Sequence, residues 1–162
     1  MEFLNLFSNI KNLSFTHCVE ASSADFDKIK LLGASVNHCV TSNRLLNNTK
    51  LDLEKLKDIP FTIGTDGLSS NNSLSMFDEL RNALMAHSDK NILEFSRTLL
   101  KAATINGSRA LGLNKGAIIK GLDADMIGFT LPDKIEDKED LAMQIILHTK
   151  FVDKTIIGGE FV

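Results

Sequence analysis

The chain has 162 residues, of which 43% are hydrophobic and 24% charged, and its 18 Lys and Arg against 21 Asp and Glu give a formal net charge of −3. This composition is typical of one globular domain and excludes the highly charged, weakly hydrophobic class of disordered chains. No apolar run approaches the roughly 18 residues that span a bilayer, and residues 1–10 lack a signal-peptide pattern, so we expect a cytoplasmic protein. The acidic balance, without a stripe of Lys and Arg, argues against nucleic-acid partners and favours small molecules.

Apolar periodicity predicts alternating strands and helices in the first two-thirds of the chain. The predicted strands cover 13–19, 34–38 and 61–66; the predicted helices begin at Ser22 or Ser23, cover 51–56, begin at Ser73 or Ser75, and cover 91–104. The polar stretch 41–49 is predicted to be a loop. Strands that alternate with helices in this way indicate a parallel sheet or barrel built from βα units.

The last third of the chain has a different character, because glycines interrupt it repeatedly after Asn106. The pattern there predicts a strand over 126–129, a helix over 138–147 and a strand over 151–157 that Gly158 and Gly159 close. This stretch is therefore predicted to be a small β-rich annex. No long linker precedes it, so we expect the two parts to pack together.

Polar residues end all three predicted parallel strands. His-Cys-Val occurs at 17–19 and again at 38–40, and the third strand ends at Asp66. Since the carboxyl ends of parallel barrel strands line one mouth, we expect His17, His38 and Asp66 to converge on one pocket. Each also has a structural interpretation, the histidines as hydrogen-bonded groups and Asp66 as a turn former. His87 has no motif partner and is expected to be a surface or structural residue.

Taken together, these residues and their neighbours indicate a protein family far more specifically than any one of them does alone. The runs Thr16-His17-Cys18, 36–43 (VNHCVTSN), 63–72 (IGTDGLSSNN), 76–79 (MFDE), 103–113 (ATINGSRALGL) and 123–127 (DADMI) resemble the amidohydrolase superfamily. The branch that they resemble is that of the aminohydrolases and chlorohydrolases. Within it, the chain is most similar to the aminofutalosine deaminases of menaquinone synthesis.

This resemblance implies an α/β fold, the C-terminal portion of a metal-dependent (β/α)₈ barrel with a small β-rich annex. Residues 1–110 would form a partial barrel with strands six to eight, and residues 111–162 would belong to a composite β-sandwich annex with one helix. The implied activity is that of a hydrolase acting on C–N bonds, which deaminates or dehalogenates a purine-like heterocycle. The implied cofactor is a divalent metal, zinc by resemblance.

The resemblance also implies roles for individual residues. Asp66 matches the family's carboxylate after the eighth strand, which is a metal ligand and can accept a proton from the attacking water. His17 matches the catalytic histidine after the sixth strand, where an imidazole can orient that water. Ser70 falls where related enzymes contact the substrate ring, and His38 is a candidate for the same role.

Two residues near the second strand have a supporting role by the same resemblance. Ser42 and Asn43 are expected to fix the loop after strand seven rather than to bind substrate. His38 could serve either purpose.

Other parts of the family pattern are missing from this sequence. The family has a His-x-His pair after its first strand, and a histidine with a glutamate three residues on after its fifth strand; neither is present. A complete barrel takes about 250 residues, more than this chain has. We therefore expect a C-terminal fragment whose metal site is incomplete, which is inactive alone and which exposes surfaces that favour self-association.

Two alternatives stay open. The chain could be a non-catalytic α/β module that binds a small molecule, with Gly64 to Asn72 as a phosphate-holding turn, although this loop lacks the spacing of known phosphate loops. It could also be one piece of a split enzyme that is active only with a partner polypeptide.

Overall fold

The computed structural model describes residues 6, 7, 9–132 and 134–162; residues 1–5 and 8 of the predicted 1–110 domain lie outside the described residues. Its first sheet is parallel, with strand order β1-β2-β3. The three strands are β1 (Ser14–Thr16), β2 (Ser35–His38) and β3 (Phe61–Ile63). The connections contain α2 (Ser23–Leu31), then α3 (Val40–Asn47) and the 3₁₀ turn η1 (Leu53–Lys55). The predicted alternation of strands and helices is confirmed here.

A helical layer follows the third strand. It consists of α4 (Met76–Ala86), α5 (Ile92–Lys101), the π-helical turn η2 (Ala102–Asn106) and α6 (Gly107–Ala110). Ser75 caps α4 by accepting from the Asp78 N–H, and Asn91 caps α5. The predicted helix over 91–104 therefore continues, through the π turn, to Ala110.

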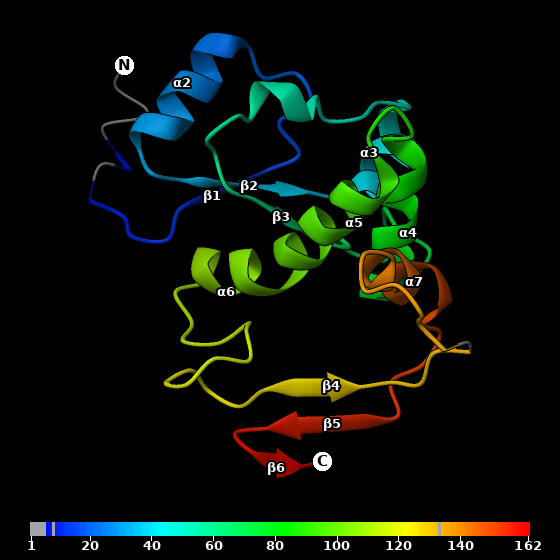
Figure 1. Cartoon of the computed structure of the whole chain (residues 1–162). Helices are drawn as coiled ribbons and strands as arrows, with labels where there is room; N and C mark the ends of the chain where they lie inside the picture. Colours follow the sequence, from blue (N-terminus) through cyan, green and yellow to red (C-terminus); the bar gives the residue numbers. More distant parts are fainter. Residues whose placement is uncertain (1–5, 8, 133) are drawn as a thin grey trace.

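The second sheet is antiparallel, with strand order β4-β5-β6, and lies on the other side of α6 from the parallel sheet (Figure 1). Its strands are β4 (Met126–Gly128), β5 (Lys154–Ile157) and β6 (Glu160–Phe161). The intervening helix α7 (Leu141–His148) packs against α4 and α5 rather than on this sheet. Arg81 of α4 donates to the carbonyls of Ile146 and Thr149 and fixes the end of α7.

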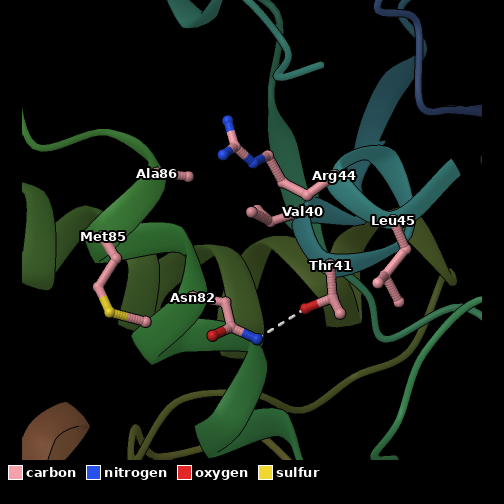
Figure 2. A pocket seen from close by; sticks show the side chains of 7 residues that line it. All are labelled: Val40, Thr41, Arg44, Leu45, Asn82, Met85 and Ala86. Carbon is pink, nitrogen blue, oxygen red and sulfur yellow. Dashed lines mark hydrogen bonds between the residues drawn. The ribbon is translucent and has the colours of Figure 1, made fainter. Parts of the chain in front are cut away.

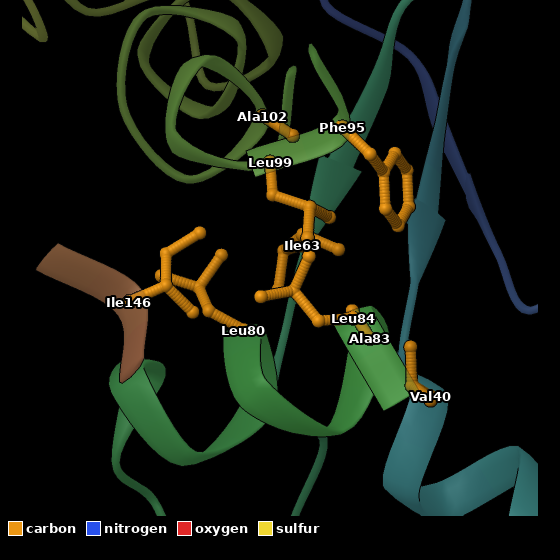
Figure 3. Close-up of a cluster of buried hydrophobic side chains, with 9 residues drawn as sticks. All are labelled: Val40, Ile63, Leu80, Ala83, Leu84, Phe95, Leu99, Ala102 and Ile146. Atoms are coloured by element: carbon orange, nitrogen blue, oxygen red, sulfur yellow. The ribbon is translucent and has the colours of Figure 1, made fainter. Parts of the chain in front are cut away.

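Two buried clusters hold the structure together. One lies between β3 and helices α4, α5 and α7, and Figure 3 shows its members: Val40, Ile63, Leu80, Ala83, Leu84, Phe95, Leu99, Ala102 and Ile146. The other packs α2 against β2, with members Phe26, Ile29, Ala34, Val36, Leu51, Leu56 and Ile59. Packing of helices onto the strands in this way is what βα units require.

Two local predictions were wrong. The stretch 41–49 is not a loop, because α3 occupies most of it. The first turn of α3 is polar but buried, and its side chains are held by tertiary contacts that local propensity does not register. The predicted first strand is also too long, since it ends at Thr16 and the next two residues adopt left-handed backbone conformations. Among the described residues, no helix is both long and apolar enough to cross a membrane.

Candidate active site

His17 and Asp66 lie together at the carboxyl edge of the parallel sheet. His17 directly follows β1, Asp66 lies three residues after β3, and His17 Nε2 is 3.6 Å from Asp66 Oδ2. Both residues have positive φ angles, 71° and 61°, in the left-handed region that only glycine adopts freely. Strained conformations of this kind cost about 1–3 kcal/mol and are concentrated at functional sites. The backbone is thus bent at both positions in a way that brings the two side chains together.

The first turn of α3 positions this pair. Ser42 Oγ donates to Asp66 Oδ2 at 2.7 Å, and Asn43 Oδ1 lies 2.8 Å from His17 Nδ1. Ser42 and Asn43 are both buried, so their side chains cannot turn toward solvent instead. The expectation was that they fix a loop after the second strand; instead they lie in the first turn of α3, and their side chains contact Asp66 and His17.

Three donors surround the Asp66 carboxylate. Besides Ser42 Oγ, the Gly67 N–H donates to Oδ1 at 2.8 Å, and Ser70 Oγ donates to Oδ2 at 2.9 Å. These hydrogen bonds, that from Ser42 above all, hold the pKa of Asp66 below its usual value, because they stabilise the charged form. Among the described residues, Oδ1 accepts only the bond from Gly67, which leaves it a lone pair for a cation or a proton.

The contact with Asn43 indicates which nitrogen of the His17 ring is the donor. With the Asn43 amide oxygen as the partner, Nδ1 of His17 donates this bond, because an amide oxygen can only accept; the Asn43 Nδ2 has no hydrogen-bond partner among the described residues. The other ring nitrogen, Nε2, then presents its lone pair on the side of Asp66. About a third of each side chain is exposed, 39% for His17 and 34% for Asp66, so both can be reached from solvent.

His38 does not join this group, which corrects the expectation that all three strand-end residues share one pocket. Its side chain is completely buried on the helix-covered face of the sheet, with Nε2 3.0 Å from Nε2 of His87. Burial, with smaller effects from His87 and His17, lowers the pKa of His38 to about 3; burial likewise lowers the pKa of His87 to about 4. Both rings are therefore neutral at neutral pH, and the completely buried ring of His38 is a structural group rather than the expected substrate contact.

One buried acid was missed by the sequence analysis. Glu79 of α4 is 1% exposed and accepts hydrogen bonds from Thr41 and Asn71. The sequence does contain a signal of this burial. Glu79 occupies a position on the apolar stripe of α4, three residues after Met76 and four before Ala83. A charge at such a position has to be paired inside the protein.

The described residues do not form a complete metal site. Nowhere in the described part of the chain do three His, Cys, Asp or Glu side chains gather closely enough to hold a metal ion. Asp66 offers one hard oxygen and His17 one nitrogen, whereas tight zinc sites have three or four protein ligands. The residues present fit a part of such a site only.

Two hollows in the described part of the chain lie away from this pair. A groove of about 380 Å³ runs between α3 and α4. Figure 2 shows Arg44, Leu45 and Met85 along it, and the hydrogen bond from Asn82 to Thr41 that also lines it. A second cavity of about 530 Å³ lies between α6 and the β4 strand. Neither is lined by His17, Asp66 or Ser70. The His17–Asp66 pair therefore stands at an open edge of the sheet rather than inside either of these hollows.

Comparisons with known proteins agree on one family. The profile of the amidohydrolase family matches residues 4–162. An aminodeoxyfutalosine deaminase from a Nitratiruptor species is 46% identical over 158 residues, which cover 98% of this chain and 39% of that protein. The crystal structure of Helicobacter pylori aminofutalosine deaminase in complex with methylthio-coformycin has a TM-score of 0.90 at 36% identity, over 99% of this chain and 40% of that one.

A third similar protein is an adenosine deaminase from Xanthomonas campestris with bound zinc, with a TM-score of 0.81 at 29% identity, over 94% of this chain and 37% of that chain. In each comparison this chain spans well under half of the matched protein. Because the family profile covers nearly all of the chain and a relative is 46% identical to it, the chain belongs to the amidohydrolase family.

Proposed function

We propose that this chain supplies the carboxyl-terminal part of the active site of a deaminase that hydrolyses a C–N bond in a purine-like heterocycle. The observation that carries the proposal is the His17–Asp66 pair, held by Ser42 and Asn43 at the carboxyl edge of a parallel sheet. Parallel barrels carry their catalytic groups at this edge. The reaction adds the oxygen of water to the ring carbon that bears the amino group, and releases that group as ammonia.

Each residue of the pair has a distinct task in the proposal. Asp66 would hold the divalent metal with a carboxylate oxygen, and the metal would supply Lewis acidity to the site. The lone pair of His17 Nε2 accepts a hydrogen bond from the attacking water and orients it. Ser70, whose hydroxyl donates to Asp66 on the same loop, would contact the substrate ring. The remaining metal ligands would come from outside this chain.

The substrate class is proposed from the relatives. The Nitratiruptor and Helicobacter proteins are named as deaminases of aminodeoxyfutalosine and aminofutalosine, and the Xanthomonas protein as an adenosine deaminase. We therefore propose a purine-like nucleoside as the substrate class, and an aminofutalosine as the more specific candidate. Zinc is the proposed metal, since the Xanthomonas structure is described with it bound. We place the reaction in the cytoplasm.

Because metal ligands are missing, we propose that residues 1–110 form a partial barrel, with strands six to eight of eight. Residues 111–162 would form its annex. In the described chain, β1 and β3 each pair only with β2, so both edges of the parallel sheet are open. The annex also carries exposed apolar side chains, with Ile127 52%, Ile157 56% and Phe161 73% exposed. Such edges and surfaces favour association with further chain, and alone they favour self-association.

A chimera tests the proposed function. The part of the Nitratiruptor deaminase that lies outside the matched region is fused to this chain, and ammonia release from adenosine-type nucleosides and aminofutalosine is measured. We expect deamination by the chimera and none by the 162-residue chain alone. Asp66→Asn should lower the rate by more than about 100-fold, because it removes a charged metal ligand.

Asp58→Asn is the matched control, because Asp58 is an exposed carboxylate paired with Lys30 on the surface. It should leave the rate unchanged. A folded chimera without deaminase activity, or an active Asp66→Asn chimera, would contradict the proposal.

A further inference from the structure

Glu79 is the most completely buried acid in the described structure, and it has a full set of partners. Oε1 accepts from the Thr41 N–H at 2.9 Å, and Oε2 accepts from Thr41 Oγ1 at 2.6 Å and from Asn71 Nδ2 at 3.1 Å. Both carboxylate oxygens act as acceptors, which is the hydrogen bonding of the ionised form. Burial of a charge is costly unless the charge is hydrogen-bonded in this way. The arrangement therefore holds α4 firmly to α3 and to the loop that contains Asn71.

No cation pairs with Glu79 among the described residues, so its charge is balanced in another way. Thr41 is the second residue of α3, and the N-cap residue Cys39, which directly precedes the helix, makes no capping bond with its side chain. Glu79 therefore acts as the cap of α3 from another helix, and its negative charge faces the positive end of the helix dipole.

The first turn of α3 carries three consecutive contacts. Thr41 contacts Glu79, Ser42 contacts Asp66 and Asn43 contacts His17. Successive residues of a helix point about 100° apart, so one turn faces three directions at once. Any displacement of this turn from Glu79 would shift Ser42 and Asn43 as well.

The second partner of Glu79 is bonded to the loop that carries Asp66. Asn71 Nδ2 also donates to the Thr65 carbonyl at 2.7 Å, in the residue directly before Asp66. Glu79 thus fixes both sides of the His17–Asp66 pair, through α3 on one side and through the loop 65–71 on the other.

Asn82 orients the hydroxyl between these groups. Its Nδ2 donates to Thr41 Oγ1 at 2.7 Å, from one turn further along α4 (Figure 2). Since that hydroxyl already accepts from Asn82, its own proton is directed to Glu79 Oε2.

We propose that Glu79 is a positioning residue of the active site, which sets the orientation and tautomer of His17 and the placement of Asp66 without contacting either. The catalytic consequence of this role rests on the proposed function, whereas the structural role does not. Glu79→Gln replaces one acceptor oxygen by an NH₂ donor. That group opposes the donors on Thr41 and Asn71, so the first turn of α3 loses its fixed position.

The tautomer of His17 is the direct readout. The 162-residue chain is labelled with ¹⁵N-histidine and studied by solid-state NMR at alkaline pH, so that the oligomeric state does not matter; loss of a signal in His17→Gln assigns His17. In the wild type we expect Nδ1 to carry the proton. In Glu79→Gln we expect a mixture of both tautomers. A folded Glu79→Gln chain with His17 in the wild-type tautomer would overturn the proposal.

Two further variants sharpen the test. Glu54→Gln removes an equally charged side chain that is exposed and paired with Lys90, and it should leave His17 unchanged. If it changes His17 as Glu79→Gln does, the effect is not specific and the proposal fails. Should Glu79→Gln not fold, Thr41→Val decides instead, because it removes the hydroxyl contact but keeps the backbone one; we expect a partial tautomer mixture, and an unchanged His17 would overturn the proposal.

Kinetics of the chimera give a second readout. Glu79→Gln should lower kcat by about 10- to 100-fold, as loss of an outer partner of catalytic groups does, with KM nearly unchanged. A raised KM at normal kcat would contradict a positioning role. An inactive wild-type chimera would refute the proposed function but leave the tautomer experiment intact, so the two failures can be told apart.

Discussion

The hydrogen bond from Ser42 to Asp66 yields a prediction about stability and pH. Ser42 is completely buried and its hydroxyl is the leading cause of the low pKa of Asp66. Ser42→Ala removes this donor and leaves the carboxylate with Gly67 N and Ser70 Oγ. The pKa of Asp66 should therefore rise toward its ordinary value.

The magnitude follows from the exposure of the carboxylate. A hydrogen bond to a charged group contributes about 1.5–3 kcal/mol when it is well shielded. A third of the Asp66 side chain is exposed, so water can replace part of the lost bond, and we expect Ser42→Ala to cost about 1 kcal/mol at neutral pH.

The sign of the pH dependence is fixed by the lowered pKa. A carboxylate whose pKa is lower in the folded state stabilises the fold above its unfolded pKa, about 3.9 for Asp, and this stabilisation is lost as the pH falls through the folded value. The difference between wild type and Ser42→Ala should therefore be largest at pH 7 and shrink below about pH 4. Urea unfolding across this range and ¹³C titration of the Asp66 carboxyl measure it. A difference that stays the same from pH 7 to pH 3 would refute this reasoning.

Two further predictions concern the core and the buried histidines. Leu99→Ala should destabilise the fold by about 2–5 kcal/mol in urea unfolding, since Leu99 is completely buried, whereas Leu31→Ala, at an 87% exposed position, should change it by less than about 0.5 kcal/mol. The lowered pKa values of His38 and His87, about 3 and 4, mean that the unfolded chain binds more protons below about pH 6.5. The unfolding free energy should thus fall from pH 7 to pH 5, with a smaller fall in His87→Gln; an equal fall in the variant would contradict this.

The parallel sheet could be predicted from the sequence because each of its strands is a short apolar run between turn signals. The placement of His38 could have been predicted as well. Val36 is apolar and buried, and side chains two apart on a strand share a face, so His38 had to point to the same helix-covered side. The expectation of convergence at strand ends overlooked this alternation.

Other parts of the site were beyond the sequence. His17 reaches Asp66 because the chain leaves β1 in a left-handed conformation, which strand alternation does not predict. The helix α3 forms although its first turn is polar, because Thr41, Ser42 and Asn43 find partners on three other segments. Local propensity cannot register contacts with residues 24 to 38 positions away.

The most direct test of the central claim, that Asp66 is one ligand of a metal site completed from outside this chain, is the metal content of the purified protein by elemental analysis, with its mass in solution measured on the same sample. We predict no tightly bound metal on the 162-residue chain, one zinc or similar ion per chimera, and loss of that ion in Asp66→Asn. A monomeric 162-residue chain that retains one tightly bound metal ion would contradict the account.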